Sequence, residues 1–331
     1  MKIGIVGSGS IVETFMDAAL KVDGAQPVAL FSRSTDSERA CYLSKKYNLT
    51  LFSDFDEMIS DSNIDFIYVA SPNSLHYYYS LKALKNKKNV ICEKPFTSTI
   101  NEAEELYKAA KENNVMLFEG IATIHYPNYK IIKDNLFRVG NIKIAQLNFS
   151  QYSSRYDYFL SGGSPNVFNP KYSGGSLMDI NIYNIHFMLG LFGLPESSSY
   201  FPNLHENGID TSGVLIMKYP KFIASLTGAK DSVSNNFCTL QGEKGCMYIN
   251  TGANSCDSVT IEIFGEKSKI TLNNQFEQNR LYYEVFNFKS IYENRDYNEA
   301  NSLCEYSIKV IGFVENLRKS AGIYFEADNS K

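Results

Sequence analysis

The stretch KIGIVGSGSIV, residues 2–12, decides the fold because an apolar run leads directly into a glycine-rich turn. Residues 2–6 are typical of a buried strand, and residues 13–22 carry apolar side chains near one helical face. A strand that turns through glycines into a helix places backbone N–H groups where they bind phosphate. The sequence therefore predicts a dinucleotide-binding turn formed by Gly7, Ser8, Gly9, Ser10 and Ile11.

The turn departs from the full dinucleotide fingerprint at one position. Val12 stands where a third glycine normally allows close packing of helix on strand. We expect this change to shift the helix without abolishing phosphate contact. Glycines also form ordinary turns, so the assignment depends on the position of this turn after the first strand.

Strand-like and helical segments alternate through the first 120 or so residues. The strand-like runs are residues 2–6, 27–33, 64–73, 89–95 and 115–120, and the helical runs are 13–22, 34–48, 74–88 and 99–114. Ser34 or Thr35 is the expected cap of the second helix, and Thr99 that of the fourth. This alternation predicts a parallel sheet with helices on both faces.

After residue 121 the pattern changes to hairpin-spaced strands with glycine turns, at 143–154, 213–231, 235–251 and 258–265. Their partial alternation predicts an antiparallel sheet with one face packed and one free. The expected fold is thus α/β: an N-terminal Rossmann domain (1–121) with a doubly wound parallel sheet, then a C-terminal α+β domain (122–331) with an open, largely antiparallel sheet. A closing helix at about 298–320 is expected to pack back on the first domain.

Composition excludes several classes of partner. The 331 residues are 44% hydrophobic and 21% charged, with a net charge of -4, which is typical of a soluble globular protein and does not favour nucleic acid or membrane binding. The six cysteines form no CxxC pair and no metal-ligand spacing with the four histidines, so no metal site is expected. Because no signal peptide or bilayer-length apolar segment is evident, we expect a cytoplasmic protein.

The end of the second strand, FSRST (residues 31–35), indicates which dinucleotide is bound. Ser32 and Arg33 stand where NAD-binding chains carry an acid, and no acid occurs before Asp36. A guanidinium and a hydroxyl bind a 2′-phosphate, which a carboxylate would repel. The sequence predicts NADP(H) in preference to NAD(H), the alternative being that Arg33 is a solvated loop residue.

Two further strand ends carry candidate cofactor ligands. Ser71, Pro72 and Asn73 turn the chain after the third strand, and His76 follows as either a cofactor contact or a packed histidine. Glu93 and Lys94 end the next strand before a proline, in the stretch ICEKPF (residues 91–96). Proline restricts the residue before it to extended conformations, so Lys94 is expected to point off the strand end, where ligands bind in such sheets. Glu93 is equally compatible with a supporting role.

These motifs together resemble the Gfo/Idh/MocA oxidoreductases over nearly the whole chain. The resemblance is carried by the glycine turn, SPNSLH at 71–76, EKP at 93–95 and GGSLMDINIYNIH at 174–186. Within the family, the Ser-Arg pair and the Asp179–Tyr183 spacing are most similar to NADP-dependent dihydrodiol and xylose dehydrogenases and to glucose–fructose oxidoreductase. The cyclitol dehydrogenases have histidine where this chain has Tyr183. QYSSRYDYF at 151–159 resembles a bacterial subgroup whose substrates are generally unassigned.

The resemblance implies that Lys94 lies beside the nicotinamide and the substrate hydroxyl, with Asp179 and Tyr183 as its catalytic partners from the second domain. Four-residue spacing places Asp179 and Tyr183 on one helical face. Free tyrosine has a pKa of about 10, and a neighbouring ammonium favours the phenolate. The pair would therefore serve as proton acceptor and donor.

Other residues of the second domain are weaker candidates. His186 and Arg155 are candidate substrate contacts, the alternatives being a core histidine and a surface arginine. Lys230 and Asp231 are candidates for the cleft edge. The segment EGIATIHYPNY (119–129) lacks the arginine common in the dehydrogenase members, which leaves the substrate open.

The expected function is an NADP(H)-dependent oxidoreductase that transfers a hydride between nicotinamide and a sugar, polyol or related cyclic alcohol or ketone. One alternative is a non-catalytic dinucleotide-binding regulator of the same fold; another is a carbonyl or imine reductase acting on a non-sugar. The presence of Lys94, Asp179 and Tyr183 together favours an enzyme. The expected partners are a small-molecule substrate and further copies of the chain, in a homodimer or dimer of dimers formed through the C-terminal sheet.

Overall fold

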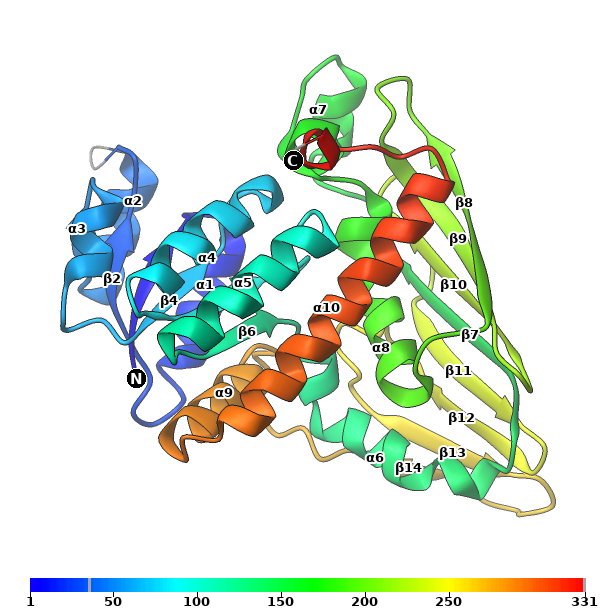
Figure 1. Ribbon diagram of the computed structural model, residues 1–331. Coiled ribbons are helices and arrows are strands. Elements are labelled where there is room, and N and C mark those ends of the chain that lie inside the picture. The colour runs from blue at the N-terminus through cyan, green and yellow to red at the C-terminus, as the bar shows by residue number, and fades with distance from the viewer. Residues whose placement is uncertain (35–36, 330–331) are drawn as a thin grey trace. The chain divides into compact units, whose positions relative to one another are not determined.

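The computed structural model describes residues 1–34 and 37–329 and divides into two compact units (Figure 1). The first comprises residues 1–121 and 279–311, and the second comprises residues 122–278 and 312–331. The long helix α10 (Tyr297–Ser320) begins in the first unit and ends in the second. Thr35, one of the two residues expected to cap the second helix, and Asp36 lie outside the described residues.

The described part of the first unit contains a six-stranded parallel sheet in the order β3-β2-β1-β4-β5-β6. The strands are β1 (Lys2–Val6), β2 (Gln26–Phe31), β3 (Thr50–Phe52), β4 (Phe66–Val69), β5 (Asn89–Glu93) and β6 (Leu117–Gly120). The order reverses between β1 and β4, and ligands bind at such a reversal in doubly wound sheets. The predicted Rossmann sheet is confirmed.

Helices cover both faces of this sheet: α1 (Ser10–Ala19), α2 (Glu38–Tyr47), α3 (Phe55–Ser60), α4 (His76–Lys85), α5 (Ile100–Asn113) and α9 (Tyr282–Glu293). Aromatic pairs attach α9, with Phe288 stacked on Phe118 at 4.5 Å between ring centroids and Tyr292 edge-on to Phe66 at 4.9 Å. Each buried aromatic side chain contributes about 1.5–3 kcal/mol. The helix α9 thereby belongs to the dinucleotide-binding unit although nearly 200 residues separate it from α4 in the chain.

Helix caps decide where two of these helices begin. Thr99 caps α5 as predicted, and its side chain accepts a hydrogen bond from the backbone of Glu102 in a capping box. The second helix begins later than predicted, at Glu38, because the hydroxyl of Ser37 accepts a hydrogen bond from the backbone N–H of Ala40. The prediction of Ser34 as its cap was wrong.

The described part of the second unit contains an eight-stranded sheet in the order β14-β13-β12-β11-β7-β10-β9-β8. Its strands are β7 (Ile142–Ser150), β8 (Ser197–Leu204), β9 (Asp210–Lys218), β10 (Ile223–Ala229), β11 (Phe237–Gly242), β12 (Gly245–Ile249), β13 (Val259–Ile263) and β14 (Ile270–Leu272). Only β7 and β10 pair in parallel, and the other pairs are antiparallel. The largely antiparallel sheet is therefore confirmed.

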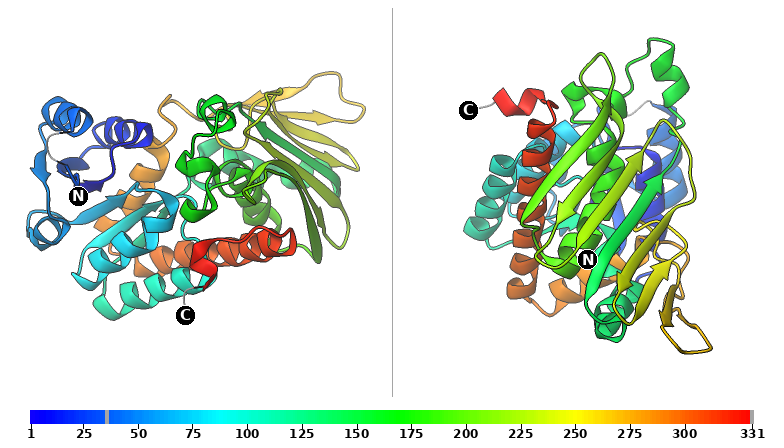
Figure 2. Two further views of the ribbon diagram at one scale, coloured as in Figure 1. Left: turned by 90° about the horizontal axis from the view of Figure 1, so that it is seen from above. Right: turned by 90° about the vertical axis from the view of Figure 1, so that its right-hand side faces the viewer.

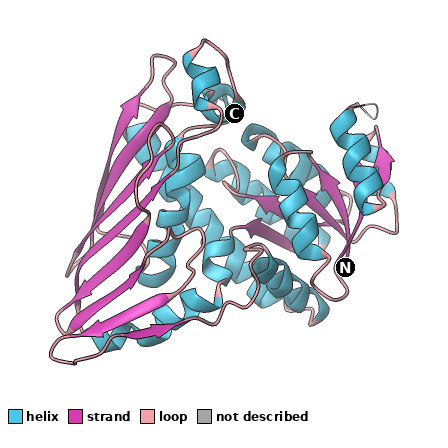
Figure 3. Cartoon of the chain, turned by 180° about the vertical axis from the view of Figure 1, so that it is seen from behind, coloured by secondary structure: helices cyan, strands magenta, loops and turns pink. Residues whose placement is uncertain are grey.

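One face of this second sheet is packed by helices. The helix α8 (Ile182–Phe192) follows a π-helical turn (Leu177–Asn181), and both contact β7 and β10. The right-hand panel of Figure 2 shows the opposite face of the sheet toward the viewer, with α8 behind it, and Figure 3 shows the strands as one broad layer beside the helices of this unit. The remaining helices are α6 (Pro127–Asn135) and the short α7 (Tyr156–Leu160).

The chain end is fixed to the second unit by a buried ion pair. Arg318, with no exposed surface, donates through Nη1 and Nη2 to the two carboxylate oxygens of Asp328 at 2.6 and 2.5 Å. The same guanidinium lies over the ring of Phe325. This geometry satisfies most of the donors of a buried guanidinium, which is the condition for a stable buried charge.

Candidate active site

The glycine turn between β1 and α1 has two glycines with different roles. Gly7 has φ +117°, and a Cβ there would collide with the carbonyl oxygen of Ala70 at the end of β4. Gly9 precedes α1, and a Cβ there would meet no atom within 4 Å. Gly7 is thus required for close strand packing, whereas Gly9 borders open space.

The start of α1 fits a dinucleotide pyrophosphate. Among the described residues no side chain caps this helix, so its first N–H groups are available to an anionic ligand in the open space beside Gly9. Val12, at the third glycine position of the fingerprint, is fully buried in the core, yet the helix still begins at Ser10. Val12 is accommodated without loss of the helix start.

Ser32 and Arg33 follow directly after β2, which ends at Phe31, two residues before the predicted strand end. The Ser32 hydroxyl donates to the carbonyl oxygen of Ser34 at 2.7 Å, and Arg33 is exposed. An exposed guanidinium and a neighbouring hydroxyl fit a 2′-phosphate.

Arg39, which sequence reasoning did not single out, also reaches the glycine turn. Its Nε donates to the carbonyl oxygen of Ser8 at 3.2 Å, and its Nη2 pairs with Glu13 at 2.6 Å. Hydrogen bonds from Lys46 and then Arg39 lower the pKa of Glu13 to about 2. A sequence signal existed in the basic residues of α2, but their direction toward α1 depends on tertiary packing.

His76 joins the loops that follow two neighbouring strands, β4 and β5. Its Nδ1 lies 2.9 Å from the carbonyl oxygen of Pro95, and its Nε2 lies 3.0 Å from that of Ser71. Burial is the main cause that lowers the pKa of His76, so the ring is neutral near pH 7 and donates to one carbonyl. His76 is thus packed between the two loops, and its contact with a cofactor stays a prediction. Pro72 precedes the short 3₁₀ turn Asn73–Leu75 in this connection.

Lys94 follows β5 directly, is half-buried, and is joined to Pro95 by a cis peptide bond. The preceding Glu93 is buried and accepts a hydrogen bond from the Tyr68 hydroxyl at 2.6 Å. Burial is the first cause that raises the pKa of Glu93. Glu93 therefore lies beneath the strand end as a buried carboxyl group, in a position to support Lys94.

A second buried carboxyl group, Glu284 on α9, was not anticipated from the sequence. It has no exposed surface, and neither of its carboxylate oxygens has a hydrogen-bond partner among the described residues. Burial first, then the negative charge of Glu93, raises the pKa of Glu284 well above its ordinary value. A charged form here would lack solvation, so the folded protein holds this proton to higher pH than the unfolded chain does.

We expect Glu284→Gln to stabilise the protein at alkaline but not at acid pH. A folded-state pKa above the unfolded one means that the free energy of unfolding falls as pH rises through the folded-state pKa. The substitution removes this loss, so at pH 8 the variant should unfold at a higher urea concentration than the wild type. At pH 4 the two proteins should unfold alike. The exposed Glu104→Gln is the control, and an equal gain at both pH values would contradict the expectation.

In the second unit, a glycine and a buried acid position the helix that carries Asp179 and Tyr183. Gly175 has φ +104°, and a Cβ there would collide with the carboxylate of Asp210. Asp210 in turn accepts hydrogen bonds from the backbone of Leu177 at 2.7 Å and from the Tyr200 hydroxyl at 2.6 Å. The start of the helix is therefore fixed to β9 and β8.

Asp179 lies within the π-helical turn, and Tyr183 lies in the first turn of α8. The four-residue spacing was predicted to lie on one regular helix, but the π turn changes the local register, and such turns are frequent at functional sites. Tyr183 is 9% exposed and packs edge-on against Phe149 at 5.7 Å. Asp179 forms an ion pair with Lys230, which follows β10.

The other candidates of the second unit lie in different environments. His186 is fully buried in α8, and its neighbour His125 has a pKa lowered to about 3, first by burial and then by the charge of His186. Arg155 is exposed at the start of α7. The structure thus places His186 in the core and Arg155 on the surface, and it adds His125, whose only sequence signal was its place in residues 119–129.

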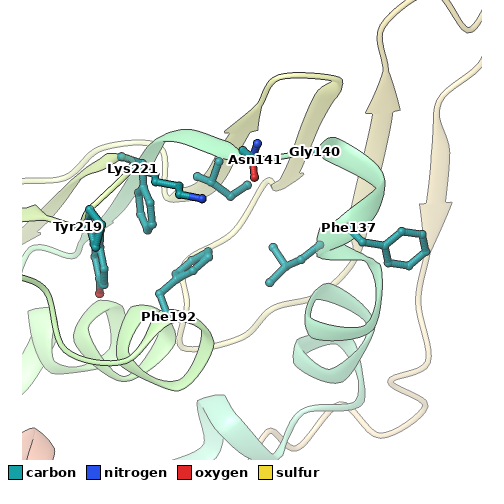
Figure 4. Close-up of a pocket in the computed structure, with 10 residues that line it drawn as sticks. Phe137, Gly140, Asn141, Phe192, Tyr219 and Lys221 are labelled. Carbon is teal, nitrogen blue, oxygen red and sulfur yellow. The ribbon is translucent and has the colours of Figure 1, made fainter.

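The second unit also contains a cavity of about 440 Å³ that includes none of the predicted site residues. It lies between the turn after α6, the end of α8 and the turn from β9 to β10. Figure 4 shows Phe192 and Lys221 extending into the space between these segments, whereas the ring of Phe137 points away from it. Its lining is mainly apolar, and because no predicted substrate residue belongs to it, this cavity and the predicted site are separate features.

The described residues contain no group of three or more metal-ligating side chains placed to hold a metal ion. Within the same described part of the chain, no helix combines the length and the apolar character needed to cross a membrane.

The chain combines a dinucleotide-binding sheet with an α+β unit whose helix carries an acid and a tyrosine. This combination is typical of one class of two-domain nicotinamide-dependent oxidoreductases. Comparison with known proteins agrees: residues 1–121 match the model described as "Oxidoreductase family, NAD-binding Rossmann fold", and residues 137–271 match the "GFO/IDH/MocA C-terminal domain". The chain belongs to the Gfo/Idh/MocA family of oxidoreductases.

Relatives with assigned activities extend over most or all of the chain. The scyllo-inositol 2-dehydrogenase (NADP(+)) IolU of Bacillus subtilis is 35% identical and covers 100% of both chains. The D-xylose 1-dehydrogenase (NADP(+)) of Hypocrea jecorina is 28% identical over 75% of this chain and 72% of its own. Among solved structures, KijD10, a 3-ketoreductase from Actinomadura kijaniata in complex with NADP and TDP-benzene, has a TM-score of 0.84 at 20% identity, covering 98% of this chain and 99% of that chain. The last similarity concerns the fold alone.

Proposed function

We propose that the chain is an NADP(H)-dependent oxidoreductase that interconverts a hydroxyl and a carbonyl group on a sugar, polyol or related cyclic substrate. One observation carries the proposal: the sheet order sets the ends of β1, β4 and β5 side by side, so the glycine turn, Ser71–Asn73 and Lys94 share one edge. Relatives named as NADP-dependent inositol and xylose dehydrogenases support the cofactor and substrate class.

The residues of the first unit would hold the cofactor. The start of α1 after Gly9 fits the pyrophosphate, and Ser32 with Arg33 fits the 2′-phosphate of NADP(H). The bound nicotinamide supplies the hydride acceptor or donor. His76 fixes the loop after β4 to the loop after β5, and so keeps Lys94 in place relative to Ser71.

Three side chains would handle the substrate and its proton. In the oxidation direction, the phenolate of Tyr183 would accept the proton of the substrate hydroxyl, and the C–H hydride would pass to the oxidised nicotinamide. The ammonium of Lys94 favours this phenolate and stabilises negative charge on the substrate oxygen. Asp179 orients the substrate by accepting a hydrogen bond from a second hydroxyl. Reduction of the ketone runs through the same groups in reverse.

The substrate class is tested by following nicotinamide absorbance in two assays. One combines NADP⁺ with a panel of aldoses, inositols and linear polyols, and the other combines NADPH with the matching ketones. At least one cyclic polyol or aldose should be oxidised with NADP⁺ faster than with NAD⁺. Absence of turnover across the panel in both directions would contradict the proposal.

We expect Arg33→Asp to weaken NADPH binding by about 30-fold, as befits loss of a hydrogen bond to a charged group. The affinity for NADH, which lacks the 2′-phosphate, should change less than about 3-fold, so NADH serves as the control within the same variant. Fluorescence titration measures both. Equal losses of affinity for NADPH and NADH would show that Arg33 does not bind the 2′-phosphate.

We further propose that the free face of the second sheet joins two copies of the chain. Ile144, Val214 and Ile223 lie on neighbouring strands of this sheet with 44%, 37% and 53% of their surface exposed. An apolar surface of this kind is typical of an interface between identical chains. Light scattering should give the mass of two or four chains for the wild type and of one chain for Ile223→Lys. Val233→Lys, in a loop outside the sheet, is the control, and a single-chain mass for the wild type would refute the interface.

A further inference from the structure

Lys230 is a buried lysine whose backbone is fixed on both sides. It follows the last residue of β10 and is 5% exposed. Its N–H donates to the carbonyl oxygen of Thr211 at 2.8 Å, and its own carbonyl accepts from the N–H of Ser153 at 2.9 Å. The backbone of Lys230 is therefore held between β9 and the segment after β7.

The ammonium of Lys230 has one ionic partner in the described structure, the carboxylate of Asp179. It also lies 5.5 Å from the ring centroid of Phe168, which is fully buried. The adjacent carboxylate of Asp231 is directed elsewhere, accepting hydrogen bonds from the hydroxyls of Thr211 and Ser212 at 2.7 Å each. Among the described residues, the ammonium of Lys230 thus pairs with Asp179 and not with the adjacent Asp231.

The two members of this pair differ in access to solvent. The side chain of Lys230 is 6% exposed and that of Asp179 is 26% exposed. The cation therefore lies behind the carboxylate, and a small molecule reaches Asp179 before it reaches Lys230. A charge-assisted hydrogen bond in a buried environment is strong and directional, so it fixes both the ionised state and the orientation of the carboxylate.

We propose that Lys230 is the positioning residue of the active site, which holds Asp179 as an ionised and oriented hydrogen-bond acceptor for a substrate hydroxyl. The role rests on the proposed function, and the π turn at Leu177–Asn181 carries Asp179 beside the end of β10. Lys230 acts through Asp179 and makes no contact with the substrate.

The proposal is tested by a double-mutant cycle with Lys230→Met and Asp179→Asn, measured with the best substrate of the panel. Lys230→Met keeps the apolar stem and its packing on Phe168 but removes the charge. It should lower kcat/KM by about 50-fold, with a loss in kcat and unchanged NADPH affinity. Because Lys230 acts through Asp179, the double variant should be no worse than Asp179→Asn within about 2-fold.

Two further variants separate positioning from folding. Lys230→Arg retains the charge and should recover at least about a third of the kcat/KM lost in Lys230→Met. If Lys230 were important only for folding, restoring the charge would not be expected to restore kcat/KM. Lys88→Met removes a half-buried lysine of the first unit that donates to the backbone carbonyls of Asp61 and Ile64. It should lower the melting temperature while leaving kcat/KM unchanged.

Urea unfolding provides an arm that needs no activity. Lys230→Met should lower the unfolding midpoint, and adding Asp179→Asn should bring it back toward the wild type because the carboxylate that has lost its neighbouring cation is removed. A wild-type chain with no turnover would defeat the proposed function and the positioning role together. If the wild type is active, any of three results would overturn the positioning role alone. These are a kcat/KM of Lys230→Met within about 3-fold of the wild type, losses in kcat/KM that multiply in the double variant, and no recovery of the unfolding midpoint in the double variant.

Discussion

Replacing Lys94 by alanine is expected to lower kcat/KM by about 10³-fold while leaving NADPH affinity within about 3-fold of the wild type. The ammonium follows the end of β5 directly, between a buried carboxyl group and a proline. We propose that this ammonium stabilises the transition state, in which negative charge develops on the substrate oxygen. Preorganised charges at such positions typically contribute a factor of 10²–10³ to kcat, roughly.

The controls for Lys94→Ala distinguish lost chemistry from lost structure. Because Lys94 is half-buried at the end of a strand, its removal should leave the melting temperature nearly unchanged. Lys85→Ala, an exposed lysine at the end of α4, should have full activity. Lys94→Arg retains the charge in a different shape and should remain strongly impaired. Loss of NADPH binding in Lys94→Ala, with turnover otherwise intact at saturating cofactor, would assign Lys94 to cofactor binding only.

Tyr183→Phe is expected to lower kcat by about 10²–10⁴-fold, the usual contribution of a general acid or base. The ring of Tyr183 packs edge-on against Phe149, and phenylalanine preserves this packing. The fold should therefore be retained, and only the transferable proton is lost. The rise of the oxidation rate with pH, which reports formation of the phenolate, should disappear in the variant.

The matched control for Tyr183 is another buried tyrosine of the same unit. The hydroxyl of Tyr129 donates to the carbonyl oxygen of Phe187 at 3.0 Å. Tyr129→Phe should cost about 1 kcal/mol of stability through the lost hydrogen bond and leave kcat/KM unchanged. If Tyr183→Phe behaved like this control, with a stability loss and normal turnover, the proposed proton transfer would be wrong.

The parallel sheet could be predicted because its strands are short apolar runs bounded by strong turn signals. Residues 2–6 end at Gly7, whose positive φ no other residue adopts easily. Thr99 with Glu102 is a local capping pattern, and it forms as predicted. Such signals lie within a few residues of each other in the chain, so the sequence alone is sufficient to detect them.

Elements without local signals were missed. The helix α9, with the sequence YYEVFNFKSIYE, has aromatic residues on several sides and no clear polar face, because it packs against both α1 and the sheet. The edge strands β8 and β14 carry polar or short sequences that do not alternate clearly. The residue types at Leu177–Asn181 do not distinguish a π turn from an α-helix. In the structure this turn carries Asp179 to the end of β10, where it pairs with Lys230.

The same distinction applies to the candidate site. Lys94, Asp179 and Tyr183 were found from motifs in which the informative residues are adjacent or four apart. The pairing of Lys230 with Asp179 joins residues 51 positions apart, and Glu284 lies nearly 200 residues from Glu93 in the chain. Sequence patterns of a single chain do not report such contacts, because they arise from how the strands and helices pack.

A crystal structure of the protein with NADP⁺ and an oxidisable polyol tests the central claim most directly. The account predicts that Lys94 Nζ and Tyr183 Oη both lie within hydrogen-bond reach, about 3 Å, of the substrate oxygen whose carbon faces nicotinamide C4. A complex in which the polyol carbon faces C4 while either group stays more than about 6 Å from that oxygen would contradict it.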